Sequence, residues 1–409
     1  MNQISSSAIS RTNSFLDEFN NLPMDLLHKQ SDVASEADVQ RVFATSVSGN
    51  SLSLSDFSIL LSDAAASLLE SLCTRSVQLT RQRFGKVIRF FAPLYLSNEC
   101  INNCKYCGFS RDNAILRLTL SLDEVENEAR LLHSQGFRNI LLVSGEHPKF
   151  VTNGYMEECV RKLRKFIPTV ALEIGPMETP DYIPLVKAGS EGLVVYQETY
   201  DREAYRVMHT AGPKKDFDWR LATPERAYDA GFRRLGIGAL FGLSDWRQEA
   251  LALAAHARFL MNRCWKSTVT VSFPRLRPCA GTFVPDHLMT DRQLVQLTAA
   301  FRLFLPDVGI VLSTREPASL RDGLWPLGIT HASAGSHTEP GGYTGAGKEK
   351  LHQTVRGRQV ALESSPDDSM SATGQFDIAD LRSPADVAAY LTNIGYEPVW
   401  KDWDFALGE

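Results

Sequence analysis

From Val87 onwards, short runs of β-branched and apolar residues alternate with longer stretches whose apolar residues recur at helical spacing. Runs of the first kind are typical of buried parallel strands, and stretches of the second kind are typical of amphipathic helices. Eight such runs predict a (β/α)8 TIM-type barrel, and a doubly wound parallel sheet is the alternative. The predicted strands are Val87–Leu96, Asn139–Val143, Thr169–Ile174, Gly192–Tyr196, Leu235–Leu240, Ser267–Phe273, Gly309–Leu312 and Ile329–Ala332.

The segments on either side of this pattern have a different character, which divides the chain into five parts. Residues 1–50 are polar and rich in serine, with short helical patterns around Phe15–Leu27 and Ala37–Phe43, and we expect a flexible N-terminal arm. Residues 51–86 carry helical periodicity and form a helical N-terminal extension. Residues 87–343 form the barrel, residues 344–375 a mobile loop or insertion, and residues 376–409 a C-terminal helix with an aromatic tail that should dock.

Composition and charge narrow the possible functions. The chain has 409 residues, with 43 Lys and Arg against 48 Asp and Glu, so its net charge is −5. This mildly acidic balance argues against nucleic-acid binding, and no apolar run is long enough to span a membrane. Asp17 and Glu18 argue against an organelle-targeting peptide, so we expect a cytoplasmic protein.

Three cysteines follow the first predicted strand within eight residues, at Cys100, Cys104 and Cys107. The C-x3-C-x2-C spacing lets one loop place three thiolates around a [4Fe-4S] cluster, and no fourth ligand is nearby, so one iron would stay open. A structural zinc site is disfavoured because zinc takes four tetrahedral ligands. A disulfide is disfavoured because the chain has seven cysteines, an odd number, and no signal-peptide pattern.

The cysteine loop, with Tyr106 before its last cysteine and Gly108 and Phe109 after it, resembles the radical S-adenosylmethionine (SAM) superfamily. Further motifs resemble, in order and spacing, the tyrosine lyases of thiamine biosynthesis, the 2-iminoacetate synthase family. The resemblance extends from about Leu79 to the C-terminus and is interrupted by residues 344–375, which depart from the shorter family pattern. The motifs are Leu142–His147, Val195–Tyr200, Gly238–Asp245, Ser272–Pro278, Leu312–Glu316 and Val399–Asp404.

This resemblance implies an activity and its partners. A 5′-deoxyadenosyl radical derived from SAM would take hydrogen from the amino group of L-tyrosine, and the Cα–Cβ bond would break to give 2-iminoacetate (dehydroglycine) and p-cresol. The resemblance also implies that the three cysteines hold the cluster, that Glu146 faces SAM, and that Arg315 and Ser333 face tyrosine. Thiazole synthase would receive the product, and flavodoxin or ferredoxin would donate the electron.

The other candidate site residues follow predicted strands, where a barrel carries its chemistry. Gly145 permits a close backbone approach, and Arg220 could pair with the carboxylate of SAM. Arg315 could pair with a substrate carboxylate or with Glu316, and Tyr95 could cover the same substrate. The candidates for SAM are Tyr106, Ser144, Gly145, Glu146, Glu173, Gln197, Glu198 and Arg220, and those for the substrate are Arg315, Ser333 and Tyr95.

Three other functions are alternatives to the tyrosine lyase activity that the resemblance implies. A hydrogenase-maturation tyrosine lyase is disfavoured, because its second cluster is held by cysteines in a C-terminal extension and no cysteine follows Cys279 here. A tryptophan lyase shares some motifs but has Met-Cys-Ser where this chain has Tyr106, Cys107 and Gly108. A non-enzymatic metal-binding scaffold predicts neither a SAM site nor so many polar residues at the strand ends.

Overall fold

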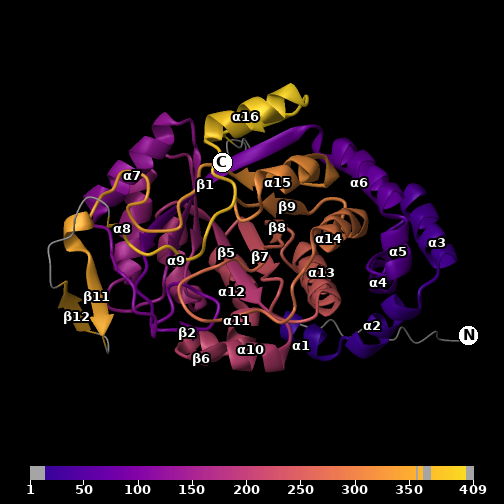
Figure 1. Ribbon diagram of the computed structural model, residues 1–409, viewed down its shortest axis with the longest axis horizontal. Helices are drawn as coiled ribbons and strands as arrows, with labels where there is room; N and C mark the ends of the chain where they lie inside the picture. Colours follow the sequence, from indigo (N-terminus) through magenta and orange to yellow (C-terminus); the bar gives the residue numbers. More distant parts are fainter. Residues whose placement is uncertain (1–13, 356–357, 363–369, 402–409) are drawn as a thin grey trace, which may run out of the picture.

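The computed structural model describes residues 14–355, 358–362 and 370–401, and within them eight parallel strands surrounded by helices form a barrel (Figure 1). The strands are β1 (Val87–Ser97), β3 (Asn139–Ser144), β4 (Thr169–Glu173), β5 (Ser190–Glu198), β7 (Arg234–Ala239), β8 (Thr268–Ser272), β9 (Gly309–Leu312) and β10 (His331–Ser333). They pair in this order, and β1 also pairs with β10, which closes the sheet. This closure confirms the predicted barrel and excludes an open doubly wound sheet.

Several of the helices between the strands begin where the sequence provides side-chain caps. They are α7 (Leu122–Ser134), α8 (Asn153–Leu163), α9 (Thr179–Lys187), α10 (Arg202–Met208), α11 (Phe217–Leu221), α12 (Thr223–Ala230), α13 (Trp246–Arg263), α14 (Asp291–Phe304) and α15 (Ala318–Leu324). Ser121 and Glu124 form a reciprocal capping box at α7, and Thr290 and Gln293 form one at α14. Each box satisfies backbone N–H groups that a helix start leaves without partners.

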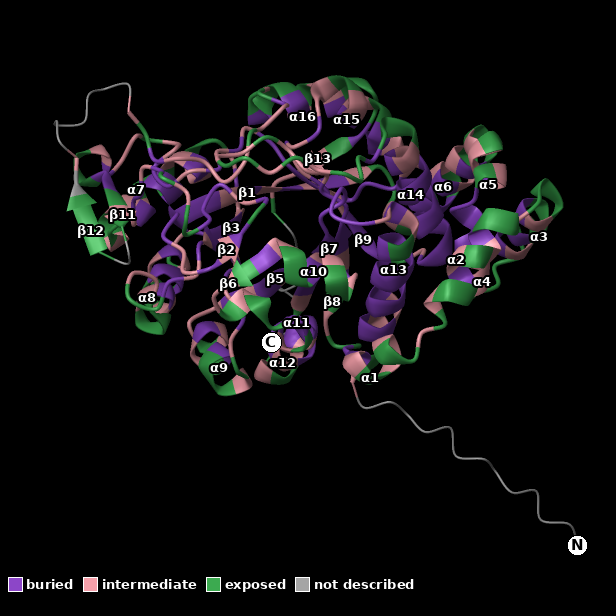
Figure 2. Ribbon diagram, turned by 60° about the horizontal axis from the view of Figure 1, so that its bottom comes forward, coloured by how far each residue is buried: buried purple, intermediate pink, exposed green. Residues whose placement is uncertain are grey.

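The longest of these helices, α13, is buried along nearly its whole length (Figure 2). Its residues from Ala250 to Ala257 are buried at every position. A helix that is buried on all sides needs a partner on each side. The barrel covers one side of α13, and N-terminal helices cover another.

The N-terminal region differs from the flexible arm that we expected for residues 1–50. Residues 14–50 contain three helices, α1 (Phe15–Asn20), α2 (Met24–Val33) and α3 (Glu36–Val47). Phe15 is fully buried and stacks on His256 of α13, with 4.1 Å between the ring centroids. The expectation is therefore wrong for residues 14–50, because a few apolar anchors dock these mostly polar helices. Residues 1–13 lie outside the described part of the chain.

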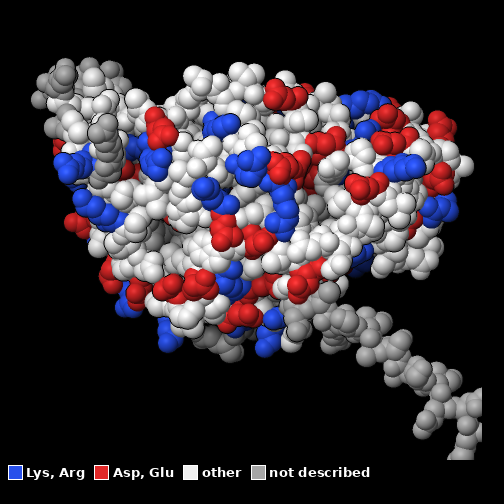
Figure 3. Space-filling view, turned by 90° about the horizontal axis from the view of Figure 1, so that it is seen from below, with Lys and Arg blue, Asp and Glu red and all other residues white. Residues whose placement is uncertain are grey.

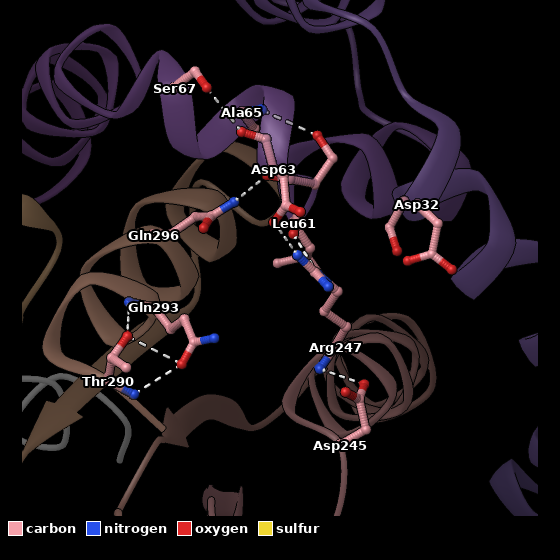
Figure 4. Close-up of polar contacts among 12 residues, drawn as sticks. Asp32, Leu61, Asp63, Ala65, Ser67, Asp245, Arg247, Thr290, Gln293 and Gln296 are labelled. Carbon is pink, nitrogen blue, oxygen red and sulfur yellow. Dashed lines mark hydrogen bonds and ion pairs between the residues drawn. The ribbon is translucent and has the colours of Figure 1, made fainter. Parts of the chain in front are cut away.

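The predicted helical extension consists of α4 (Leu54–Leu60), α5 (Asp63–Ser67) and α6 (Leu69–Phe84), and it docks on α13 and α14 (Figure 4). Gln296 of α14 donates hydrogen bonds to the carbonyls of Leu60 and Ser62, at 3.0 and 2.9 Å. Arg247 of α13 donates to the carbonyl of Leu61 at 2.9 Å. These bonds satisfy carbonyls where α4 ends and fix the extension to the barrel.

The region after β10 is more ordered than the mobile loop that we expected for residues 344–375. Its described part contains a short 3₁₀ helix, η3 (Lys348–Lys350), and a hairpin of β11 (His352–Val355) and β12 (Arg358–Ala361). The backbones of His352 and Arg117 exchange two hydrogen bonds of 2.8 and 3.2 Å, which joins the hairpin to the barrel. The mobile-loop alternative is therefore wrong for these residues, and the insertion alternative stays a prediction.

The C-terminal segment docks on the outside of the barrel, as expected for an aromatic tail. It contains α16 (Pro384–Asn393) and β13 (Glu397–Val399), and β13 pairs in parallel with the start of β1. The ring of Trp400 packs edge-on against Phe90 and Phe137, with centroid distances of 5.0 and 5.1 Å. Trp403 and Phe405 lie outside the described residues.

Charged side chains of both signs are intermixed on the face seen in Figure 3. This distribution agrees with the nearly balanced count of acidic and basic residues. Among the helices of the described segments, none combines the length and the apolar character that crossing a bilayer requires.

Candidate active site

The strand ends that carry most of the predicted site residues lie together at the C-terminal end of the barrel, which we call the barrel mouth. Tyr95 lies near the end of β1, Ser144 ends β3, Glu173 ends β4, Glu198 ends β5 and Ser333 ends β10. Parallel strands bring these ends to the same rim, so residues far apart in sequence become neighbours.

The cluster loop, residues 98–110, follows β1 and is held at both ends by one arginine. Arg117 is buried, and its guanidinium donates to the carbonyls of Asn98 at 2.6 Å and Ser110 at 2.9 Å. It also donates to the carbonyl of Phe109 at 3.3 Å. A guanidinium is a rigid fork of donors, so it fixes the entry and the exit of the loop relative to each other.

The three cysteines lie on this loop with unequal exposure: Cys104 is buried, and Cys100 and Cys107 are half-buried. Cys104 belongs to β2 (Asn103–Cys104), which pairs with β6 (His209–Ala211). Burial raises the pKa of Cys107 to about 11 and also raises that of Cys104. Without a metal the thiols of Cys104 and Cys107 are therefore protonated near neutral pH, and loading a cluster would release their protons.

The cysteines do not form a site for a single metal ion. Within the described residues, no three His, Cys, Asp or Glu side chains gather in the arrangement that one ion needs. In a [4Fe-4S] cluster each thiolate binds its own iron, so the ligands stand further apart than around one ion. The donor set therefore fits a cluster better than the zinc knuckle that we weighed.

Tyr106 is fixed by a buried histidine rather than exposed to a ligand. The phenol of Tyr106 lies 2.7 Å from Nε2 of His209, and Nδ1 of His209 lies 2.8 Å from the carbonyl of Tyr205. Burial lowers the pKa of His209 to about 3, so the ring is neutral. Nδ1 donates to the carbonyl, and Nε2 accepts from the phenol. His209 thus positions the residue beside the last cysteine.

The segment after β3 forms a cradle beside the cluster loop. A side chain at Gly145 would lie 2.3 Å from the carbonyl oxygen of Glu99, so only glycine lets the two backbones approach this closely. The hydroxyl of Ser144 is buried and has no hydrogen-bond partner among the described residues. Asn102 donates to the carboxylate of Glu146 at 2.7 Å, which orients it. An unpartnered buried hydroxyl fits a polar ligand such as SAM.

A charged cluster lies at the end of β5 and includes a cation that the sequence did not identify. Glu198 has φ +73° and is the one non-glycine with positive φ in the described segments, a conformation that costs energy and is typical of functional sites. Its carboxylate lies 2.6 Å from Nζ of Lys214 and 3.6 Å from the guanidinium of Arg220. Arg220 also donates to the carbonyl of Tyr196 at 2.8 Å. Lys214 is in η1 (Pro213–Lys215).

Glu173 and Gln197 lie close to this cluster. Burial, with a smaller contribution from the charge of Glu198, raises the pKa of Glu173 to about 7. Gln197 donates to the carbonyl of Phe217 at 3.3 Å, while its own amide oxygen is buried without a partner among the described residues. Both side chains can therefore form a hydrogen bond with a polar ligand.

Arg315 lies in a small cavity at the barrel mouth, with a volume of about 60 Å³. The cavity also contains the other two substrate candidates, Tyr95 and Ser333, together with Glu173. The alternative partner Glu316 is taken by Arg275, with 3.0 Å between Oε1 and Nε, so a pair between Arg315 and Glu316 does not form. Among the described residues, no carboxylate forms an ion pair with Arg315. A substrate carboxylate would supply one.

This cavity is also lined by Gln375, the last residue of the segment that we expected to be a mobile loop or insertion, and by Phe376, which follows it. The guanidinium carbon of Arg315 lies 3.3 Å from the ring centroid of Phe376. The phenol of Tyr95 donates to the amide oxygen of Gln375 at 2.8 Å. The ring of Tyr95 packs edge-on against Phe109 of the cluster loop, with 5.9 Å between centroids. The cluster loop and the cavity therefore share a wall.

A larger cavity of about 450 Å³ lies at the other end of the barrel, among residues that begin the strands, such as Asn139 and Gly309. It shares Phe91, Leu141, Tyr196, Ser272 and Val311 with the cavity at the barrel mouth. The candidate active site is therefore identified by its chemistry and not by its size.

Sequence reasoning missed four side chains that build this site: Arg117, Lys214, Gln375 and Phe376. Arg117 and Lys214 carried no motif, although Lys214 follows Gly212 and Pro213, a turn signal that places it beside a strand. Gln375 and Phe376 follow a stretch rich in Gly, Ser and charge, and composition alone gave no reason to place them in the site.

Two family models match the chain. Residues 94–254 match the Radical SAM superfamily, and residues 272–397 match the Biotin and Thiamin Synthesis associated domain. The first match covers the cluster loop, the cradle and the charged cluster, and the second covers Arg315 and Ser333. The first match also contains Tyr95, so the division separates the cofactor candidates from two of the three substrate candidates, Arg315 and Ser333.

Two known proteins are similar over nearly the whole chain. The 2-iminoacetate synthase of Escherichia coli (strain K12) is 41% identical over 395 residues, which cover 96% of this chain and 98% of that protein. The FeFe-hydrogenase maturase HydG from Carboxydothermus hydrogenoformans is 33% identical, with a TM-score of 0.78 and coverage of 95% of this chain and 84% of that chain. A second crystal structure of HydG has a TM-score of 0.85 at 28% identity, and covers 96% of this chain and 82% of that one.

Proposed function

Because the chain belongs to the 2-iminoacetate synthase family of radical SAM enzymes, we propose that its barrel mouth holds a [4Fe-4S] cluster, SAM and L-tyrosine together. When bound and reduced by the electron donor, the cluster would cleave SAM to methionine and a 5′-deoxyadenosyl radical, which would take a hydrogen atom from the amino group of L-tyrosine to become 5′-deoxyadenosine. Breaking the Cα–Cβ bond would then give 2-iminoacetate and a hydroxybenzyl fragment, which a further electron and a proton would convert to p-cresol. The residues of the chain bind and orient the reactants and exclude water. The observation that carries the proposal is the shared wall of Tyr95 and Phe109 between the cluster loop and the Arg315 cavity.

The cluster is assigned to Cys100, Cys104 and Cys107. Arg117 holds the loop that carries them, and the hydrogen bond from Tyr106 to His209 braces the residue before Cys107. A rigid loop suits a cluster with three protein ligands, because the fourth iron must stay accessible to SAM.

SAM is assigned to the cradle and the charged cluster. Glu146, oriented by Asn102, suits the ammonium group, and Arg220 suits the carboxylate because a guanidinium can bind it with two parallel hydrogen bonds. The other residues that we assign to SAM carry polar side chains or, at Gly145, permit a close backbone approach. They are Tyr106, Ser144, Gly145, Glu173, Gln197 and Glu198.

L-Tyrosine is assigned to the cavity of Arg315, Ser333 and Tyr95. Arg315 carries the positive charge that a substrate carboxylate needs, and its stacking on Phe376 keeps the guanidinium in place. Ser333 is nearly completely buried, so its hydroxyl can bind the substrate away from water. The three residues come from different strand ends and can therefore contact one small molecule from different sides.

Two protein partners follow from this chemistry. 2-Iminoacetate is an imine that hydrolyses in water, so direct transfer to thiazole synthase has a chemical motive. The cluster needs an external electron donor such as flavodoxin or ferredoxin. We place the protein in the cytoplasm, because its seven cysteines are all free and a reducing compartment keeps them so.

The test is anaerobic turnover. The protein is reconstituted with iron and sulfide, reduced, and given SAM with or without L-tyrosine. We expect 5′-deoxyadenosine and p-cresol in equal amounts when tyrosine is present. Binding of iron without cleavage of SAM would instead support the metal-binding scaffold.

A further inference from the structure

Gln375 connects the cluster loop to the substrate cavity. Its amide nitrogen lies 3.9 Å from the sulfur of Cys107, and its amide oxygen accepts a hydrogen bond of 2.8 Å from the phenol of Tyr95. Residues 375 and 107 are 268 positions apart in the sequence, so the contact exists only in the folded barrel. One side chain thus contacts a cluster ligand at one atom and a substrate-cavity residue at another.

The backbone around Gln375 is fixed from two sides. Gly108, next to Cys107, donates its N–H to the carbonyl of Gln375 at 3.0 Å, and Gln375 donates its own N–H to the carbonyl of Thr338 at 3.0 Å. A side chain at Gly108 would lie 2.5 Å from the carbonyl oxygen of Gly374 and 2.7 Å from that of Gln375. Residue 108 must therefore be glycine for the segment to dock, and the docking determines where the amide of Gln375 lies.

The chemistry of an amide suits both contacts. Burial raises the pKa of Tyr95 well above its usual value, so the phenol stays protonated and acts as the donor to the amide oxygen. This leaves the amide N–H groups to face the sulfur. Hydrogen bonds to the sulfurs of an iron–sulfur cluster raise its reduction potential.

We propose that Gln375 is a positioning residue that couples the environment of the cluster to the tyrosine cavity. Its N–H hydrogen-bonds the thiolate of Cys107, and its carbonyl holds Tyr95 against the substrate. This inference rests on the proposed function, because it assumes both the cluster and L-tyrosine. The inference goes beyond the proposed function because it names one residue, Gln375, on which both the reduction potential of the cluster and the binding of L-tyrosine depend.

The test is Gln375→Leu, which keeps the volume of the side chain and removes both polar contacts. Two quantities are measured on the reconstituted protein: the midpoint potential of the cluster, and the Kd for L-tyrosine with SAM present and no reductant, so that nothing turns over. We expect a normal iron content, a more negative potential, and a Kd raised about five- to ten-fold, as for the loss of one hydrogen bond. Gln375→Met, equally long and unbranched, is measured in parallel in case leucine disturbs the packing.

Two further variants separate the contacts. Tyr95→Phe removes only the phenol that Gln375 holds, so it should raise the Kd for tyrosine without shifting the potential. In the double variant the Kd should rise no further than in either single variant, because the two residues act through one contact. Gln353→Leu makes the same exchange at an exposed position of β11 and should change neither quantity.

The inference is overturned if the potential of both Gln375 variants equals that of the unmodified protein, even if tyrosine binds more weakly. It is also overturned if the effects of Tyr95→Phe and Gln375→Leu on the Kd simply add. Failure of the proposed function looks different, since the unmodified protein itself would then lack the cluster or fail to bind tyrosine.

Discussion

Arg315 lies directly over the ring of Phe376, with its guanidinium carbon 3.3 Å from the ring centroid. The two residues come from different parts of the chain, one from the end of β9 and the other from the segment that covers the barrel mouth. The aromatic ring stabilises the cation without neutralising it, so the positive charge remains for an anionic group of the substrate.

Arg315→Lys keeps this charge but loses the planar fork. We expect kcat/KM for L-tyrosine to fall at least about ten-fold, because a bidentate contact becomes a single one, while the Kd for SAM stays unchanged. Tyrosine turnover and SAM binding are measured on the same preparation. A weaker SAM affinity with normal tyrosine affinity would instead assign Arg315 to the cofactor.

Cys104→Ala should abolish cleavage of SAM, because Cys104 is one of the three proposed cluster ligands and no fourth cysteine lies on the cluster loop. The unmodified protein should bind about four irons after anaerobic reconstitution, and the variant clearly fewer. Cys73→Ala, a half-buried cysteine of α6, is the matched control and should behave like the unmodified protein. SAM cleavage retained by Cys104→Ala would refute the cluster assignment.

Lys214→Met should weaken SAM binding and lower Tm. The carboxylate of Glu198 would lose its nearest cation, and removing one member of a buried ion pair costs about 2–3 kcal/mol here, below the usual range because Lys214 keeps some exposure. Lys215→Met, at the neighbouring exposed position, is the control. If both variants match the unmodified protein in SAM affinity and Tm, Lys214 has no role in the site.

Glu249, on α13, predicts a pH dependence of stability that does not involve the active site. Burial raises its pKa to about 7, although Thr199 and the N–H of Tyr200 both donate to its carboxylate. Between its usual pKa, near 4.5, and 7 the folded protein keeps a proton that the unfolded chain releases. Stability should therefore fall as pH rises through this window, by up to about 3 kcal/mol.

Glu249→Gln should remove this part of the pH dependence. The difference in Tm between the variant and the unmodified protein is followed by calorimetry from pH 5 to pH 8, with Glu203→Gln, an exposed exchange, as the control. If the difference in Tm stays constant over this range, Glu249 does not keep its proton in the folded protein.

The barrel was predictable because short runs rich in apolar and β-branched residues alternate with amphipathic helical stretches, a pattern that local sequence displays directly. The three cysteines could be singled out because their spacing is itself local, and their role as cluster ligands stays a prediction. The docking of residues 14–50 was missed because their composition is polar and their stability comes from isolated anchors such as Phe15, which stacks on His256.

The contacts of the site that the sequence did not predict have one physical reason in common. They join residues that are far apart in the sequence. Gln375 reaches Cys107 across 268 positions, and Glu316 pairs with Arg275 of another strand end instead of its neighbour Arg315. Periodicity and spacing describe only neighbours along the chain. The partners of a charged residue at the barrel mouth are determined by how eight strand ends converge.

The most direct test of the function is product analysis with L-tyrosine and L-tryptophan offered together to the reduced, reconstituted protein under anaerobic conditions. The Arg315 cavity and the membership of the 2-iminoacetate synthase family predict p-cresol and 2-iminoacetate, the latter detected as its hydrolysis product glyoxylate, with no product from tryptophan. Formation of an indole product, or cleavage of SAM that tyrosine does not stimulate, would contradict the account.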